Sequence, residues 1–287
     1  MRRAHFPFHL IGFLVTLALS APAAAQEFVR SARSSGMGEA GTASTSVNGA
    51  ISVNPAGIAR EVTYAVDVGY ARTPAANVLS ASVVDSQTNP SISAGVGYSF
   101  LSGHGSFEDF SAHEIRLGIA LPVMPEQISF GVGGRYLIAE QAGVELLNGL
   151  TLDAGAMFRL NEALHLALVG RNLIDQCTRP ECASLAPLEV GGGLALGDGE
   201  ALTVGADVIV EFSNDEPSPS YRVGTEYLIQ GAVPIRAGFF YRTLTSTSHV
   251  TGGIGWRSTD AGLDSAFQIN PSDPDEWQVQ VAMSIYL

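Results

Sequence analysis

Lysine is absent from this sequence of 287 residues, and all 15 basic residues are arginine. Charge is scarce altogether, because Asp, Glu, Lys and Arg make up 15% of the chain against about 25% in ordinary soluble domains. The formal net charge of −13 argues against nucleic acid as a partner. This composition disfavours a soluble protein with a lysine-rich surface.

The N-terminus has the pattern of a secretory signal peptide. Arg2 and Arg3 precede an apolar run from about Leu10 to Leu19, and Ala23-Ala24-Ala25 supply an A-x-A cleavage site. A membrane anchor is the alternative, but the apolar run is too short to span a bilayer. We expect residues 1–25 to be a signal peptide that is removed after Ala25.

Long apolar runs are missing from the rest of the chain, where no segment approaches the 18 residues of a transmembrane helix. The chain is nevertheless apolar on average, with 46% hydrophobic residues and a mean hydropathy of +0.21. An exported chain of this composition without helical spans suggests one large β-barrel.

Cysteine is rare, with two residues five positions apart in Cys177-Thr-Arg-Pro-Glu-Cys182. An exported protein meets an oxidising compartment, so we expect a disulfide between Cys177 and Cys182. A metal site is the weaker alternative, because two cysteines without a nearby histidine supply too few ligands. The sequence predicts no metal and no cofactor.

From residue 62 onward, apolar residues alternate with small or polar ones. In the last stretch Trp277, Val279 and Val281 share one phase, while Gln278 and Gln280 share the other. Strand side chains point to opposite faces with period two, so each stretch has an apolar and a polar face. Lipid outside and a polar lumen inside make that pattern typical of an all-β, antiparallel up-and-down transmembrane barrel.

About 14 strands are predicted in the barrel region, residues 62–287, each close to the length that crosses a bilayer. Short turns alternate with longer connections, which we place outside the cell by assuming a periplasmic N-terminus. A soluble β-sandwich is the competing fold, but it explains neither the signal peptide nor the strand lengths. The expected strands are 62–72, 76–85, 91–101, 112–122, 127–138, 148–160, 163–173, 186–197, 201–213, 219–229, 233–244, 247–257, 260–270 and 276–287, and the expected longer loops are 102–111, 139–147, 174–185, 213–218 and 271–275.

The inward phase carries acids and bases in equal number. A selective ion pore would show an excess of one sign, whereas balanced charges indicate ion pairs within the lumen. Structural pairing is therefore a better interpretation than catalysis or ion selectivity. The predicted lumen charges are Asp67, Asp153, Glu189, Asp207, Glu211, Glu226 and Asp264, with Arg116, Arg135, Arg159, Arg171, Arg222, Arg236 and Arg242.

Residues 26–61 are rich in Gly, Ala and Ser and lack strand periodicity, so we expect them to plug the lumen. They contain Ser31 to Ala43 (SARSSGMGEAGTA) and Asn54 to Ala59 (NPAGIA), and Gly170-Arg171-Asn172-Leu173 follows later. These motifs resemble the FadL superfamily of outer-membrane barrels, whose N-terminal segment is a hatch inside the barrel. The resemblance implies hatch residues Gly36, Met37, Gly38, Asn54, Pro55, Ala56 and Gly57.

The C-terminus is similar to the signal read by the barrel-assembly machinery. Gln280, Ala282, Ile285 and Leu287 match its spacing, although Ala282 replaces Gly and Leu287 replaces the terminal aromatic residue. The expected location is the outer membrane of a Gram-negative bacterium, with membrane lipid as a partner.

The resemblance implies two functions. FadL-type members carry fatty acids and other hydrophobic compounds, so passive transport of small hydrophobic compounds past the hatch is the first prediction. PorV-type members bind exported proteins, and a barrel that binds an exported protein or acts as a surface scaffold is the alternative. An enzyme is not expected, because Ser248-His249 is a chance-level pair and the sequence lacks G-x-S-x-G.

Overall fold

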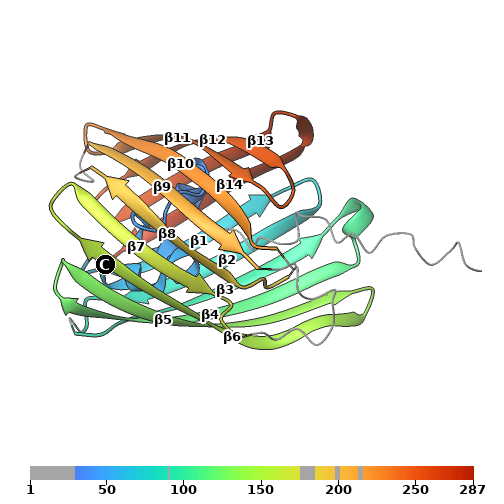
Figure 1. Ribbon diagram of the computed structural model, residues 1–287, viewed down its shortest axis with the longest axis horizontal. Helices are drawn as coiled ribbons and strands as arrows, with labels where there is room; N and C mark the ends of the chain where they lie inside the picture. The colour runs from blue at the N-terminus through green and yellow to red at the C-terminus, as the bar shows by residue number, and fades with distance from the viewer. Residues whose placement is uncertain (1–29, 90, 175–184, 198–200, 213–215) are drawn as a thin grey trace, which may run out of the picture.

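The computed structural model describes residues 30–287 except 90, 175–184, 198–200 and 213–215. Fourteen antiparallel strands form a closed barrel, in which β1 pairs with β14 (Figure 1). The predicted fold class is therefore confirmed. The expected signal peptide, the first residues of the expected hatch (26–29) and the expected disulfide lie outside the described residues.

The strands are β1 (Tyr64–Arg72), β2 (Ala76–Asp85), β3 (Ser93–Gly103), β4 (Phe110–Met124), β5 (Ile128–Gln141), β6 (Val144–Arg159), β7 (Leu164–Arg171), β8 (Glu189–Leu196), β9 (Leu202–Glu211), β10 (Ser218–Ile229), β11 (Val233–Arg242), β12 (Thr247–Arg257), β13 (Ala261–Asn270) and β14 (Asp273–Tyr286). The helices are α1 (Ala32–Gly36), α2 (Val47–Val53) and the 3₁₀ helices η2 (Pro55–Ala59) and η3 (Gly105–Phe107).

Two of the expected longer loops are wrong. In place of a loop over 139–147, β5 and β6 continue to a tight turn at Ala142 and Gly143, whose φ angles are 51° and 76°. Positive φ at both central residues suits a two-residue hairpin. In place of a loop over 271–275, only two residues connect the end of β13 to the start of β14. The ends of these strands are polar and contain bulges at Ala139/Glu140 and Ile269/Asn270. The alternation of apolar and polar residues that predicts a strand is therefore absent there from the sequence.

The barrel has two ends, which we name by the chain. The proximal end is where β1 begins and β14 ends, and the distal end carries the β1–β2, β3–β4 and β5–β6 connections. Large apolar side chains cover the outer face between them, with Val132 and Leu168 each 60% exposed. A continuous exposed apolar surface of this kind makes it a membrane-type barrel. Within the described residues, no helix has the length and apolar character needed to cross a membrane.

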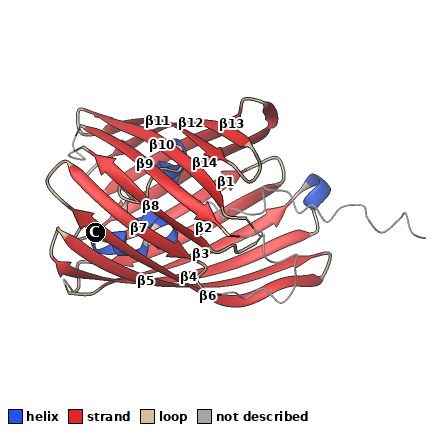
Figure 2. Ribbon diagram, in the orientation of Figure 1, coloured by secondary structure: helices blue, strands red, loops and turns tan. Residues whose placement is uncertain are grey.

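Residues 30–60, which we call the internal segment, lie inside the barrel (Figure 2). Helix α1 packs against β11 to β14, and η2 packs against β3 to β6. Each helix of the internal segment begins at a polar cap, since the side chains of Ser31, Ser46 and Asn54 accept hydrogen bonds from backbone N–H groups of the first turn. Polar helix starts explain how a segment without strand periodicity holds a defined shape in the lumen.

Candidate functional site

The internal segment lies directly on the backbone of the barrel wall at two places. On β10 and β11, a Cβ atom at Gly224 would lie 2.1 Å from the Met37 carbonyl oxygen, and one at Gly238 would lie 2.2 Å from Gly38 N. On β6, a Cβ atom at Gly155 would lie 1.9 Å from Asn54 Oδ1. Only glycine allows such close approach, so these wall positions fit the segment.

Polar groups of the wall also bind the segment. Asp207 Oδ2 accepts hydrogen bonds from Gly41 N at 2.9 Å, Thr42 N at 2.9 Å and Thr42 Oγ1 at 2.7 Å. Thr251 Oγ1 accepts from Gly38 N at 2.8 Å and donates to Gly36 O at 3.0 Å. The segment's turn is therefore held by a buried carboxylate, the stronger kind of hydrogen-bond acceptor.

A buried charge network connects the segment to β10, β11 and β13. Arg33 Nη2 lies 2.9 Å from Glu226 Oε1, and Arg236 lies 2.6 Å from both Glu226 Oε2 and Asp264 Oδ1. Burial lowers the pKa of Arg33, but the carboxylates of Glu226, Asp264 and Glu61 together outweigh it and raise that pKa above its ordinary value. Arg33 is therefore charged at any pH the protein meets.

A second network spans β4 to β8. Glu114 is 2% exposed and contacts both Arg135 and Arg116, the latter at 2.9 Å. Arg116 Nη1 lies 3.5 Å from Asp153 Oδ2. Glu189 Oε2 lies 2.7 Å from Arg171 Nε and 3.9 Å from Arg30 Nη2, which joins this network to the internal segment.

Asn172 gives the Gly170-Arg171-Asn172-Leu173 motif its structural role. The residue has a φ of 53°, and its backbone N–H donates to Asp153 Oδ1 at 2.8 Å. Its side chain accepts from Arg135 Nη1 at 3.0 Å and donates to Pro187 O at 2.7 Å. Asn tolerates positive φ better than most residues, so it ends β7 and fixes the chain against the second network.

The structure brings most of the predicted charges together inside the barrel. Arg222 and Arg242 lie 3.6 and 3.7 Å from Glu39 of the internal segment, and Asp67 accepts a hydrogen bond from Ser284 Oγ at 2.7 Å. Glu211 lies at the distal end, where it lines a cavity with both of those arginines. Arg159 differs, because it lies partly exposed at the proximal end, 3.7 Å from Glu126.

The sequence prediction missed four charged residues of these networks. Glu114 shares the inward phase with Arg116, so the alternation of β4 could have identified it. Arg30, Arg33 and Glu39 lie in the segment without periodicity, where no pattern distinguishes an inward side chain.

Within the described residues, three of the interior cavities share lining side chains from the proximal to the distal end. The first, of about 420 Å³, lies between the internal segment and strands β1 to β4 and β14, and reaches the proximal end at Glu61 and Tyr286. Residues of β9, β10, β12 and β13 also line it, among them Glu226 and Asp264. The second, of about 50 Å³, shares Arg30, Ser52 and Arg116 with the first. The third, of about 30 Å³, shares Pro187 and Glu189 with the second.

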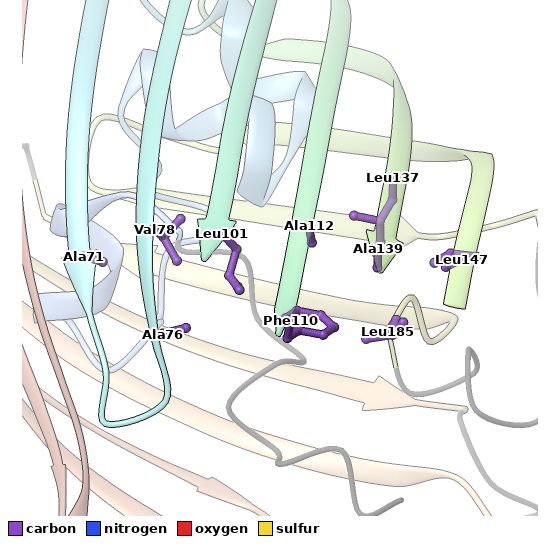
Figure 3. Packing of buried hydrophobic residues seen from close by; sticks show 10 residues of the cluster. All are labelled: Ala71, Ala76, Val78, Leu101, Phe110, Ala112, Leu137, Ala139, Leu147 and Leu185. Carbon is purple, nitrogen blue, oxygen red and sulfur yellow. The ribbon is translucent and has the colours of Figure 1, made fainter. Parts of the chain in front are cut away.

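An apolar cluster occupies the distal interior (Figure 3). Leu185 belongs to this cluster and also lines the second cavity. The other buried members come from β1 to β6 and are Ala71, Ala76, Val78, Leu101, Phe110, Ala112, Leu137, Ala139 and Leu147. The distal interior is therefore apolar along β1 to β6, whereas Glu211, Arg222 and Arg242 make it polar on the side of β9 to β11.

His249 and the four residues of the expected assembly signal make contacts that do not form a catalytic or metal site in the described residues. His249 stacks on Phe240 at 4.5 Å between ring centroids, and its Nε2 lies 3.3 Å from Glu276. No group of three His, Cys, Asp or Glu side chains in the described part of the chain has the geometry to hold a metal. At the C-terminus, Gln280 donates to Arg30 O at 2.7 Å, Ala282 lines the first cavity, and Ile285 and Leu287 are exposed.

No protein-family model matches the sequence, and no curated protein is significantly similar to it. Solved structures match well. The toluene transporter TbuX of Ralstonia pickettii aligns with TM-score 0.57 and 13% identity over 88% of this chain and 96% of its own.

The toluene transporter TodX of Pseudomonas putida has TM-score 0.64 and 12% identity, covering 88% of this chain and 96% of its own. A FadL homologue of Pseudomonas aeruginosa has TM-score 0.64 and 12% identity, covering 91% and 98%. At these identities the likeness concerns the fold, which is that of the FadL-type outer-membrane barrels.

Proposed function

We propose that this FadL-type barrel is a passive outer-membrane channel for small hydrophobic compounds, with residues 26–61 as its hatch. The apolar cluster in the distal interior is the main support for the proposal. Sites for hydrophobic compounds are lined mainly by apolar side chains, whereas a lumen for water or ions alone would be lined by polar ones. The cluster touches the series of cavities through Leu185, so a compound held by the cluster has a way inward.

Two further points support this function. Solved structures with the same fold include transporters of toluene, an uncharged apolar compound. The balanced ion pairs of the interior favour no charge sign, which suits uncharged cargo better than ions. The exposed apolar outer face and the expected signal peptide support location in the outer membrane.

Uptake of labelled toluene by Gram-negative cells that produce the protein tests the proposal. We expect faster uptake than in cells without it, and slower uptake when Leu185→Asp and Leu101→Asp make the cluster polar. The matched control is Leu79→Ala, a change on the lipid face of β2. Uptake equal to that of cells without the barrel would contradict the proposal.

Binding of an exported protein is the second candidate, and the short distal turns favour it. The β5–β6 and β13–β14 hairpins end in tight turns instead of long loops at the distal end, and a protein partner could bind against them. Native mass spectrometry after gentle extraction separates the two functions. A small lipid-like or aromatic adduct supports transport, whereas a stoichiometric protein adduct supports the second function.

A further inference from the structure

We propose that solutes pass beside the internal segment, through the first cavity along β1 to β3 and β14, while the segment stays in place. The polar wall of that cavity would then select small compounds with a hydrogen-bonding group, such as phenols, over long alkyl chains. This inference rests on the proposed channel function and specifies its route and substrate class.

The attachments of the internal segment argue that it does not move. Met37 and Gly38 lie on the backbone of β10 and β11, so that not even a methyl group fits between them at Gly224. Asp207 accepts three hydrogen bonds from the turn at Gly41 and Thr42. Displacing the segment would expose this buried carboxylate and break the Arg33–Glu226 pair, which is costly for desolvated charges.

The wall formed by β1, β2 and β3 is packed less tightly. Ser80, Ser82 and Ser99 point inward by the alternation of their strands, yet each is only half-buried. They line the first cavity together with Asp67. The segment therefore leaves a gap on this side of the barrel, whose wall carries these serine hydroxyls together with charged side chains such as Arg116 and Glu226.

The gap connects to the distal end through side chains that the cavities share. Leu185 joins the apolar cluster to the second cavity, and Arg30, Ser52 and Arg116 join the second cavity to the first. At this junction Arg30 lies 3.9 Å from Glu189, whereas Arg116 is held 2.9 Å from Glu114. Rotation of the long Arg30 side chain can widen the junction without moving the backbone.

The chemistry of the wall determines which compounds fit. Hydroxyl and carboxylate groups lose hydrogen bonds with water when a hydrocarbon lies against them, and a phenolic O–H replaces such a bond. A cavity of about 420 Å³ is within the usual size range of small-ligand sites, so a single-ring compound fits in it. The apolar cluster would receive the ring, and the serine wall would accept the hydroxyl group.

A reversible tether tests whether the segment must move. A Cβ atom at Gly205 of β9 would lie 3.6 Å from Ala40 Cβ of the segment, so Ala40→Cys with Gly205→Cys can form a disulfide once Cys177 and Cys182 are replaced by serine. We expect the oxidised and reduced proteins to take up labelled p-cresol at equal rates in producing cells. A loss of uptake on oxidation that reduction restores would overturn the inference.

Blocking the gap after folding tests the route. Ser82→Cys, labelled with a benzyl methanethiosulfonate in the assembled barrel, should lower p-cresol uptake by about tenfold, because pore-lining bulk closes a narrow passage. Ala81→Cys, on the outer face of the same strand, is the matched control and should keep its uptake after labelling. Unchanged uptake with a labelled Ser82→Cys protein would overturn the route.

The substrate class is tested with the unmodified protein. We expect p-cresol uptake at least equal to that of toluene and well above that of hexadecanoate; faster uptake of hexadecanoate would overturn the selection. These outcomes differ from failure of the channel function itself, in which the unmodified barrel would increase uptake of none of the three probes.

Discussion

Gly224 and Gly134 both lie in the barrel wall, but their surroundings differ. A Cβ atom at Gly224 would lie 2.1 Å from the Met37 carbonyl oxygen, whereas at Gly134 the nearest atom would be 3.9 Å away. We expect Gly224→Ala to lower the free energy of unfolding by about 1–3 kcal/mol through overpacking. Gly134→Ala, the control, should change it little. Urea unfolding in lipid vesicles measures both, and equal effects would contradict the close fit of the segment.

Loss of the Asp207 carboxylate should also weaken the attachment of the internal segment to the barrel wall. Asp207→Asn removes the charge from a buried acceptor of three hydrogen bonds, so we expect a loss of about 1.5–3 kcal/mol in unfolding free energy. Limited proteolysis should also cut the internal segment sooner. Asp273→Asn, which alters an exposed carboxylate at the distal end, should leave both measurements unchanged.

At the scale of single residues, the sequence predicted inward positions only where strands impose alternation. Arg116 and Arg236 could be placed in this way, and Glu114 could have been. The partners of Glu226 and Asp207 could not be assigned, because Arg33 and Thr42 belong to a segment whose side chains follow no period. Their contacts depend on how that segment packs against distant strands.

At the scale of elements, Glu114 joins β4 to β5 by contacting Arg116 of its own strand and Arg135 of the next. Glu114→Gln leaves two buried arginines without their carboxylate, so we expect a loss of about 3–5 kcal/mol in unfolding free energy. Glu126→Gln removes the acid of an exposed pair with Arg159 and should cost about 0–1 kcal/mol. A similar loss in both variants would show that the Glu114 network adds no stability of its own.

Strand positions were the most predictable elements, since period two persists along the lipid face. The prediction failed at 139–147 and 271–275, where polar residues continue as paired strands beyond the apolar alternation. Composition marks a residue as polar, but it does not show whether its backbone is hydrogen-bonded to a neighbouring strand. The tight turn at Ala142 and Gly143 depends on that pairing.

At the scale of the whole molecule, the cavity was the least predictable feature. Its position depends on which part of the wall the internal segment contacts, and glycines at Gly224 and Gly155 decide this by permitting close approach. The same segment would leave a different gap if larger side chains stood at those positions. The interior route is thus a property of packing between distant parts of the chain, which no local pattern specifies.

The sequence has two tryptophans, and they lie near opposite ends of the barrel, where the two membrane interfaces are expected. Trp256 lies near the proximal end of β12 and is 50% exposed, and Trp277 lies near the distal end of β14. Amphipathic indole rings favour the headgroup level, so the two residues should mark opposite edges of the apolar belt. Fluorescence in vesicles with brominated lipids measures their depth.

We expect shallow bromines to quench both Trp256→Phe and Trp277→Phe proteins, each of which retains one tryptophan, more than bromines at the bilayer centre. A barrel with its apolar face in lipid places both indoles at similar depth on opposite sides, so the two variants should give matching depth profiles. A soluble barrel with the same strands would show no lipid quenching in either variant. Quenching of one variant alone would mean that the barrel is tilted or only partly inserted, contrary to the continuous apolar belt.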